Sequence, residues 1–356
     1  MTLRLALAFC LAGLVAVPAV AETARFVDPL DLPSSSSRTA STDMLMGVTV
    51  AGSTVVAVGP AGRILLSEDQ GIKWRQVDSP VSSDLTAVSF PTAKTGWAVG
   101  HDGVVLHTAD GGLTWKQQLD GRAIATLLVP YYQARANDGD DSSVRVIDEM
   151  TALASEPPAF PLLDVWFRND QEGFIVGAFN LILHTQNGGV SWEPWMERTD
   201  NPQRYHLYSI RGDGHELYIA GELGLLLRLD QNTQRFTALE SPYKGSFFGL
   251  IVKDQQVLAF GLRGNAYESD DAGRNWQKLI NPSETSLVAG QYLADGSALL
   301  MDQDGKLLSN RAVASELSKL PSLGSIPAFS MTLIPGASSV VIVGPAGAIA
   351  FPFSDS

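Results

Sequence analysis

Short apolar runs bounded by glycine recur along most of the chain. Ile64-Leu65-Leu66, Val104-Val105-Leu106 and Leu181-Ile182-Leu183 are three of them. Runs of this length that end near glycine are typical of β-strands, whereas stacked helix pairs would place apolar residues at i, i+3 and i+4. The hydrophobic pattern therefore predicts a protein built mainly of short strands.

An apolar residue followed in most copies by glycine marks the same strand of every repeat. Within four residues a second glycine follows, replaced in one copy by Asn180. Glycine, and after it asparagine, suits a turn that needs positive φ. The seven copies are Val58-Gly59, Val99-Gly100, Val176-Gly177, Ala220-Gly221, Phe260-Gly261, Leu300-Met301 and Val343-Gly344. They lie 41, 77, 44, 40, 40 and 43 residues apart, so one interval holds an insertion. Seven units of this period predict an all-β fold, a seven-bladed β-propeller over residues 46–356.

Four of the units share a hairpin pattern, Ser/Thr-x-Asp/Asn-x-Gly-x-x-Trp. The hydroxyl and the carboxylate or amide can accept backbone N–H groups of their own turn, and the glycine tolerates positive φ. The tryptophan buries its ring beneath the turn, where its N–H needs one partner. The pattern occurs at Ser67, Asp69, Gly71 and Trp74; at Thr108, Asp110, Gly112 and Trp115; at Thr185, Asn187, Gly189 and Trp192; and at Ser269, Asp271, Gly273 and Trp276. We expect these residues to be structural.

The long interval places an insertion at residues 120–161, between the second and third repeats. Residues 144–155 put Val144, Ile147, Met150 and Ala154 on one face of an amphipathic helix. Ala123 to Val129 could form a second helix that Pro130 ends, with residues 137–143 as the loop. The sequence therefore predicts a helical hairpin that projects from the ring. It could be a partner-binding arm or a tolerated surface insertion.

Tyr131 and Tyr132 follow Pro130 within this insertion. They could form a contact patch for a partner, or they could simply pack the hairpin against the ring. Both interpretations remain open from the sequence.

The N-terminus has the pattern of a secretory signal. Arg4 precedes an apolar run that is too short to span a bilayer, and Ala19-Val20-Ala21 is a small-residue cleavage site. Cleavage of residues 1–21 would remove Cys10, the only cysteine. We expect the mature protein to be exported and periplasmic, and not itself membrane-spanning. Residues 22–45 would then hold a polar linker and a short strand near Phe26-Val27 that completes the seventh blade and closes the ring.

The charge balance narrows the choice of partners. The chain carries 25 basic and 38 acidic residues, and loss of Arg4 with the signal leaves 24 against 38, a net charge of −14. Such a charge argues against nucleic acid or anionic lipid as the main ligand. Solubility is a sufficient explanation for the charge itself.

Catalytic and metal-binding patterns are weak. The turn accounts for Asp69, Asp110 and Asp271, which therefore should not be counted as catalytic acids. No Gly-x-Ser-x-Gly nucleophile elbow occurs, and the five histidines are not spaced as metal ligands. The sequence predicts neither a cofactor nor a metal. Hydrolysis by two carboxylates remains the alternative, because such a pair cannot be recognised without the fold.

The hairpin pattern resembles the Asp-box, or BNR, repeat of sialidases, but the Phe-Arg-Ile-Pro motif of those enzymes is absent. Together with Gly96-Trp97-Ala98-Val99-Gly100, the seven units over roughly residues 44–353 resemble the photosystem II assembly and stability factor family. The resemblance implies an exported propeller that binds membrane-protein intermediates without catalysis. Its photosynthetic members lie in the thylakoid lumen.

Two differences from that family favour its non-photosynthetic bacterial branch. This chain is acidic and lacks an arginine cluster, and it carries the insertion at 120–161. Members of that branch are similar to periplasmic companions of resistance-nodulation-division exporters. We therefore expect a monomeric, non-catalytic scaffold or assembly factor for an envelope membrane-protein complex, photosystem II-like or an exporter. The alternative is a carbohydrate-binding or glycoside-hydrolysing BNR propeller.

Overall fold

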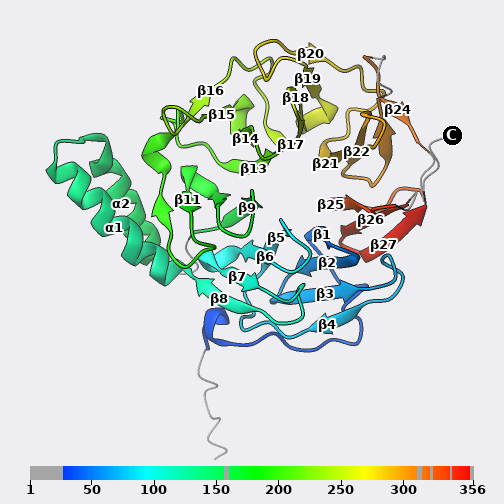
Figure 1. Ribbon diagram of the computed structural model, residues 1–356, viewed down its shortest axis with the longest axis horizontal. Helices are drawn as coiled ribbons and strands as arrows, with labels where there is room; N and C mark the ends of the chain where they lie inside the picture. The colour runs from blue at the N-terminus through cyan, green and yellow to red at the C-terminus, as the bar shows by residue number, and fades with distance from the viewer. Residues whose placement is uncertain (1–26, 156–159, 311–314, 321–323, 337–338, 353–356) are drawn as a thin grey trace, which may run out of the picture.

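The computed structural model describes residues 27–155, 160–310, 315–320, 324–336 and 339–352. Seven antiparallel sheets follow one another along the chain and surround a central axis (Figure 1). The first three sheets are β1 (Gly47–Ala51), β2 (Thr54–Gly59), β3 (Arg63–Ser67) and β4 (Arg75–Val77); β5 (Leu85–Ser89), β6 (Gly96–Gly100), β7 (Val105–Thr108) and β8 (Lys116–Leu119); and β9 (Leu162–Phe167), β10 (Gly173–Gly177), β11 (Ile182–Thr185) and β12 (Glu193–Pro194).

The remaining four sheets continue the same order. They are β13 (Leu207–Gly212), β14 (Leu217–Gly221), β15 (Leu226–Asp230) and β16 (Arg235–Ala238); β17 (Phe247–Lys253), β18 (Gln256–Gly261), β19 (Ala266–Ser269) and β20 (Gln277–Lys278); β21 (Leu287–Tyr292), β22 (Ala298–Asp302), β23 (Leu307–Ser309) and β24 (Ser318–Lys319); and β25 (Ser330–Leu333), β26 (Ser339–Gly344) and β27 (Gly347–Pro352). The predicted seven-bladed propeller is confirmed.

The landmark dipeptides all lie in the second strand of a sheet, which is the most deeply buried strand of each blade. Every residue of β6, β10 and β14 is buried, for example. The glycine of the following turn has positive φ, and Asn180 takes the same conformation with φ 62°. At Gly62 an added Cβ would lie 1.9 Å from the carbonyl oxygen of Val81, so this position also needs the smallest residue.

Large side chains fill the spaces between neighbouring blades. Trp97 of β6 stacks on Phe167 of β9, with ring centroids 3.4 Å apart and nearly parallel planes. The indole N–H of Trp97 donates to Gln118 Oε1 at 3.0 Å, and Gln118 Nε2 donates to the carbonyl oxygen of Gly188 at 2.9 Å. These contacts lock the second blade to the third, beside the point where the insertion leaves the ring.

The start of the chain closes the ring, but not as an added strand. Asp28 accepts the N–H of Leu30 and caps a 3₁₀ turn, η1 (Pro29–Asp31), and Pro29 has no N–H to give to a sheet. The predicted closing strand is therefore wrong over its described part, from Val27 onward; Phe26 lies outside the described residues, as does the predicted signal at 1–21. The seventh sheet has three strands in the portion of the chain that is described.

Residues 34–46 make the closing contacts instead. Ser34 N–H donates to the Ser79 carbonyl at 3.0 Å, and Ser37 N–H donates to Gln76 Oε1 at 2.9 Å, so this segment follows the outer strand of the first blade. Further on, Leu45 N–H donates to the Gly344 carbonyl, and Ala348 N–H donates to the Ser41 carbonyl at 2.9 Å. The first and seventh blades are thereby joined through the segment that precedes β1.

The insertion forms two helices, α1 (Gly121–Asn137) and α2 (Ser142–Ser155), that project from the ring (Figure 1). The predicted helical hairpin is confirmed, but α1 runs through Pro130, where we expected it to end. Pro130 has no N–H to donate to the carbonyl of Thr126 one turn earlier. Both residues face solvent, where water can bond that carbonyl. Ile124, Leu128 and Tyr132 are fully buried on the opposite face, which keeps the helix continuous.

The buried face of α2 also differs from the predicted one. Met150 is buried and Ile147 partly buried, as expected, but half of the Val144 side chain is exposed and Ser143 is buried instead. Ser143 Oγ donates to Asp140 at 2.9 Å at the start of the helix. The buried face of α2 therefore begins with Ser143, one residue before Val144. Neither helix reaches the length and apolarity that crossing a bilayer demands, and the same holds throughout the described ranges.

Candidate functional site

The four hairpin motifs lie between the third and fourth strands of their blades, at the periphery of the ring. In the second blade Thr108 Oγ1 donates to Asp110 Oδ1 at 2.8 Å and accepts the N–H of Gly112 at 3.0 Å, while Asp110 Oδ1 accepts the N–H of Thr114 at 2.9 Å. The other three turns repeat these hydrogen bonds. The hydroxyl and the carboxylate are thus occupied by their own turn.

The tryptophans of these motifs pack under the turns, but only two satisfy their N–H. Trp74 donates to the Gly71 carbonyl at 3.0 Å and Trp115 donates to the Gly112 carbonyl at 2.9 Å. Trp192 and Trp276 have no acceptor for the indole N–H in the described ranges. These turns pack against the preceding blade, as Gly71 does against Val341 and Gly189 against Gln118, which agrees with the structural role expected of them.

The carboxylates of these turns should make stability depend on acid pH. Hydrogen bonds from Asn275 Nδ2 and N–H, followed by those from Ser269 and Arg274, lower the pKa of Asp271 to about 2. Above the unfolded pKa near 3.8 its stabilising effect is complete, and it is lost as the pH falls from about 4 through about 2. We expect the free energy of unfolding of Asp271→Asn to fall less than that of the wild type as the pH is lowered from about 4 to about 2. Urea denaturation at stepped pH measures the difference.

The third blade offers the matched control, since it carries Asn187 at this position. Asn187→Asp should steepen the same pH dependence. If neither variant changes the slope, the turn carboxylates do not contribute to acid unfolding.

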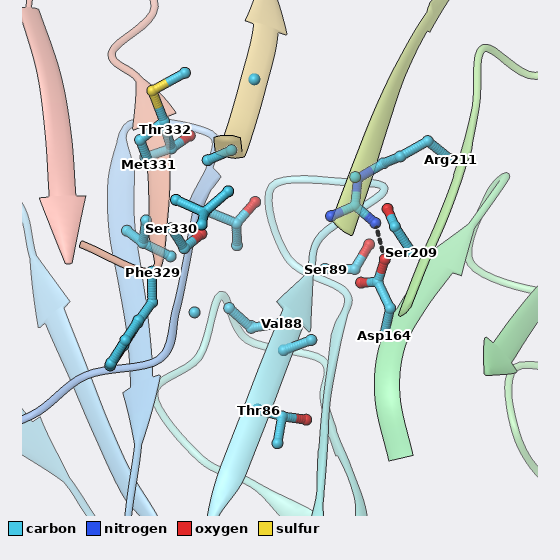
Figure 2. Close-up of a pocket in the computed structure, with 18 of the residues that line it drawn as sticks. Thr86, Val88, Ser89, Asp164, Ser209, Arg211, Phe329, Ser330, Met331 and Thr332 are labelled. Atoms are coloured by element: carbon cyan, nitrogen blue, oxygen red, sulfur yellow. Dashed lines mark hydrogen bonds and ion pairs between the residues drawn. The ribbon is translucent and has the colours of Figure 1, made fainter. Parts of the chain in front are cut away.

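A cavity of about 320 Å³ opens at the centre of the ring, where the first strands of all seven blades meet (Figure 2). Hydroxylated and small side chains make up much of its wall, beside apolar ones. Figure 2 labels Thr86, Ser89, Ser209, Ser330 and Thr332 of the first kind, together with the apolar Val88, Phe329 and Met331. Such a wall offers hydrogen bonds and shape to a ligand, but few groups that could drive a reaction.

One ion pair lies in this cavity, between Asp164 of β9 and Arg211 of β13 (Figure 2). The buried carboxylate of Asp164 also accepts the N–H of Val165 at 2.9 Å and that of Ile210 at 2.8 Å. Among the described residues that line the cavity Asp164 is the single carboxylate, whereas glycoside hydrolysis uses two. A lone acid within the apolar run Leu162–Phe167 was the sequence signal that could have revealed this pair.

Glu197 anchors the helical hairpin to the ring. Its carboxylate, only 8% exposed, accepts the hydroxyls of Tyr131 and Tyr132, each at 2.8 Å. Arg198 Nε lies 3.6 Å and Arg135 Nη1 3.8 Å from the same carboxylate. Burial first, and then the charge of Glu197, raises the pKa of Tyr132, while burial and the Glu197 hydrogen bond raise that of Tyr131.

These contacts favour packing over partner contact as the role of the two tyrosines. Tyr132 is fully buried and cannot meet a partner, and Tyr131 is partly buried with its hydroxyl engaged. Their observed role is to pack the hairpin against the ring. Glu197 lies 65 residues after Tyr132, in the segment that connects the third blade to the fourth. Sequence patterns could not reveal so distant a residue as the acceptor of the two tyrosines.

A second ion pair and a recess lie between the hairpin and the ring. Arg204, from the segment before β13, pairs with Glu149 of α2, and burial lowers the pKa of its guanidinium. The recess measures about 720 Å³ and is lined by Tyr132, Arg145, Glu197, Arg204 and Arg235 among others. Arg204 donates to the Phe179 carbonyl and pairs with Glu149, which also pairs with Arg145. Arg235 pairs with Asp200. The charged groups around the recess thus join the hairpin to the ring.

The residues that the structure describes hold no group of three or more side chains suited to a metal ion. The structure thus consists of a seven-bladed ring, a central cavity, and a helical hairpin that hydrogen bonds and an ion pair hold against the ring. This arrangement defines an Asp-box β-propeller of the kind that presents surfaces to a partner.

The family described as photosynthesis system II assembly factor YCF48 matches residues 40–127 and 150–310. The chain belongs to this family, as the resemblance in the repeat motifs predicted. The interval between the two matched ranges falls inside the helical hairpin, and the seventh blade, from β25 onward, also lies outside the matched ranges.

Two relatives and one solved structure illustrate the likeness. The photosystem II assembly lipoprotein Ycf48 of Synechococcus sp. (strain CC9902) is 31% identical over 150 residues, 41% of this chain and 44% of that one. The chloroplastic photosystem II stability/assembly factor HCF136 of Arabidopsis thaliana is 25% identical over 198 residues, 47% and 48% of the two chains. The chain thus matches about half the length of each. A structure of YCF48 bound to D1 peptide superposes with a TM-score of 0.63 at 15% identity, over 88% of this chain and 95% of that one, which shows a shared fold.

Proposed function

We propose that this protein is a non-catalytic, exported assembly factor that holds a membrane protein while its complex is built. The observation that carries this proposal is the family match, which extends over both halves of the ring. The central cavity supports it, because a wall of small polar side chains with one internally paired acid favours binding over catalysis. The relatives are named as assembly factors, and one solved propeller of this fold was captured with a peptide.

The client we propose is a membrane protein of the cell envelope, with the propeller acting from the periplasm, or from the thylakoid lumen in a photosynthetic host. The net charge of −13 and the helical insertion distinguish this chain from the photosynthetic members that it resembles, so we propose an exporter of the resistance-nodulation-division class as one client and a photosystem II-like complex as the other. In either case the propeller would meet a segment of the client that is exposed outside the bilayer.

The hairpin would serve as the arm of this scaffold. Two hydrogen bonds to Glu197 and the Arg204–Glu149 pair hold its inner face to the ring, so its outer face is presented in a fixed orientation. Val144 and Asp148 lie exposed on that outer face.

Crosslinking in the native host, followed by purification from solubilised envelope, tests the proposal. The full-length protein should recover one membrane protein, and the double variant Val144→Glu/Asp148→Arg should recover at least about tenfold less, as expected when a contact worth about 1.4 kcal/mol is lost. Val190→Glu is the matched control, because Val190 is 85% exposed on a peripheral turn. Recovery of no membrane protein by any of these proteins would reject the proposed function.

A further inference from the structure

Charged side chains mark the outer strand of six of the seven sheets. Each of these strands carries one: Arg75 in β4, Lys116 in β8, Glu193 in β12, Arg235 in β16, Lys278 in β20 and Lys319 in β24. A charge on an edge strand opposes the addition of another strand, because pairing would desolvate it. Six edges of the propeller are therefore protected against strand addition.

Within the described residues the edge of the seventh sheet carries no charge, and Pro352 at its end is the one residue there that opposes pairing. Its outer strand is β27, with the sequence Gly-Ala-Ile-Ala-Phe-Pro, and neither β25 nor β26 contains a charged residue. In the other sheets the third strand is mostly buried under the fourth, as in β11, whose four residues are all buried. In β27 the four residues from Ala348 to Phe351 are each only partly buried.

The backbone of β27 is also prepared for a partner. Ala348 pairs with Val343 of β26, yet its N–H points away from β26 and donates to the Ser41 carbonyl. Because alternate residues of a strand direct their N–H groups to the same side, the N–H of Ala350 points outward as well. Nothing in the described part of the chain accepts it.

An apolar recess adjoins this edge between the sixth and seventh blades. Leu307, Ile326, Ile342, Ile349 and Phe351 line it, together with Gly305 and Gly324. The two residues that β27 contributes, Ile349 and Phe351, lie on the side of the strand opposite to Ala348 and Ala350. An apolar side chain carried by an added strand would cover this recess.

We propose that the edge of β27 binds an extended, uncharged apolar segment of the client as a fourth, antiparallel strand. Main-chain hydrogen bonds to the outward N–H and C=O of Ala350 would provide affinity, while the N–H of Ala348 stays bonded to Ser41, and the recess would select an apolar residue. The absence of charge across the whole seventh sheet matches a neutral segment, since a charged one would lose solvation without gaining a counter-ion. This inference rests on the proposed function and adds the class of client segment and the place where it docks.

The test uses a photo-reactive benzoylphenylalanine in place of Phe351, an aromatic side chain that already lines the recess, in the full-length protein expressed in its host. We expect irradiation to crosslink it to an uncharged, apolar segment of a membrane protein, mapped by mass spectrometry. The same residue in place of Gln277, on the charged edge of the fifth blade, should give no such product. Ile349→Lys, which gives β27 the charge that the other edges carry, should reduce recovery of the client at least about tenfold.

Two further variants keep the result interpretable. Gln277→Lys adds the same charge to a protected edge and should leave recovery unchanged. Ala350→Pro removes only an outward N–H, which edge strands tolerate, and should also reduce recovery if the protein folds normally by circular dichroism.

The outcomes separate this inference from the function on which it rests. If the wild type recovers a membrane protein and Ile349→Lys recovers it equally well, the docking edge is wrong while the assembly function stands. Crosslinks from position 351 to residues 22–26 of the same chain, or to a second copy, would likewise overturn the inference. If the wild type recovers no membrane protein at all, the proposed function fails and the inference fails with it.

Discussion

Replacing Gly347 by alanine should destabilise the folded protein by about 2–5 kcal/mol, the sum expected for a forced positive φ and an overpacked contact. Gly347 has φ 86°, and an added Cβ would lie 2.0 Å from the Ser41 carbonyl oxygen and 2.6 Å from Thr42 Cα. Ser41 belongs to the segment that joins the first blade to the seventh, so the methyl group would push apart the contact that closes the ring. Urea denaturation followed by tryptophan fluorescence measures the effect.

Gly214→Ala is the matched control for this prediction. Gly214 has φ 97° and no atom within 4 Å of an added Cβ, so its replacement carries the backbone cost alone, about 1–2 kcal/mol. The difference between the two variants isolates the contact at the closure. Equal losses would show that the first and seventh blades are not held together through Ser41.

Replacing Glu197 by alanine should detach the helical hairpin, with a local cost of about 2–5 kcal/mol. The variant leaves two hydroxyls, those of Tyr131 and Tyr132, without their acceptor at a buried site. It also removes the carboxylate that faces Arg135. Hydrogen exchange should rise sharply in α1 and α2, while the seven sheets keep most of their protection.

Glu193→Ala provides the control, because Glu193 lies exposed on β12, four residues away in the chain. A cycle with Tyr132→Phe should show strong coupling to Glu197, since the two changes remove the same hydrogen bond. Unchanged exchange in α1 after Glu197→Ala would mean that apolar packing of Ile124 and Leu128 alone holds the hairpin.

The ring was predictable because its determinants are local and repeated. Each Asp-box turn is formed by residues within eight positions of one another, and each landmark dipeptide ends a buried strand. Pattern-based prediction failed for segments that occur only once in the chain. Asp28 and Pro29 make a turn where the apolar pattern predicted a strand, and Pro130 lies inside α1 because its side of the helix faces water.

The candidate site was less predictable, because its key pairs join distant segments. Asp164 meets Arg211, Tyr132 meets Glu197, and Glu149 meets Arg204, each pair separated by more than forty residues. No spacing rule connects such residues; only the closed ring brings them together. The uncharged edge of β27 could have been noticed in the sequence, but its meaning depends on knowing that six other edges carry charge.

The closure of the ring also sets an order of events in folding. Ser41 and Ala348 bond across 307 positions of chain, so this contact cannot form until the seventh blade has been made. Contacts of such long range form late, because the entropy of closing the loop must be met first. Until then the inner apolar side of the first blade, with Val55, Ala57 and Leu65, stays open to other chains. A protein proposed to guard unfinished complexes is thus itself open to aggregation and proteolysis until its last blade is in place.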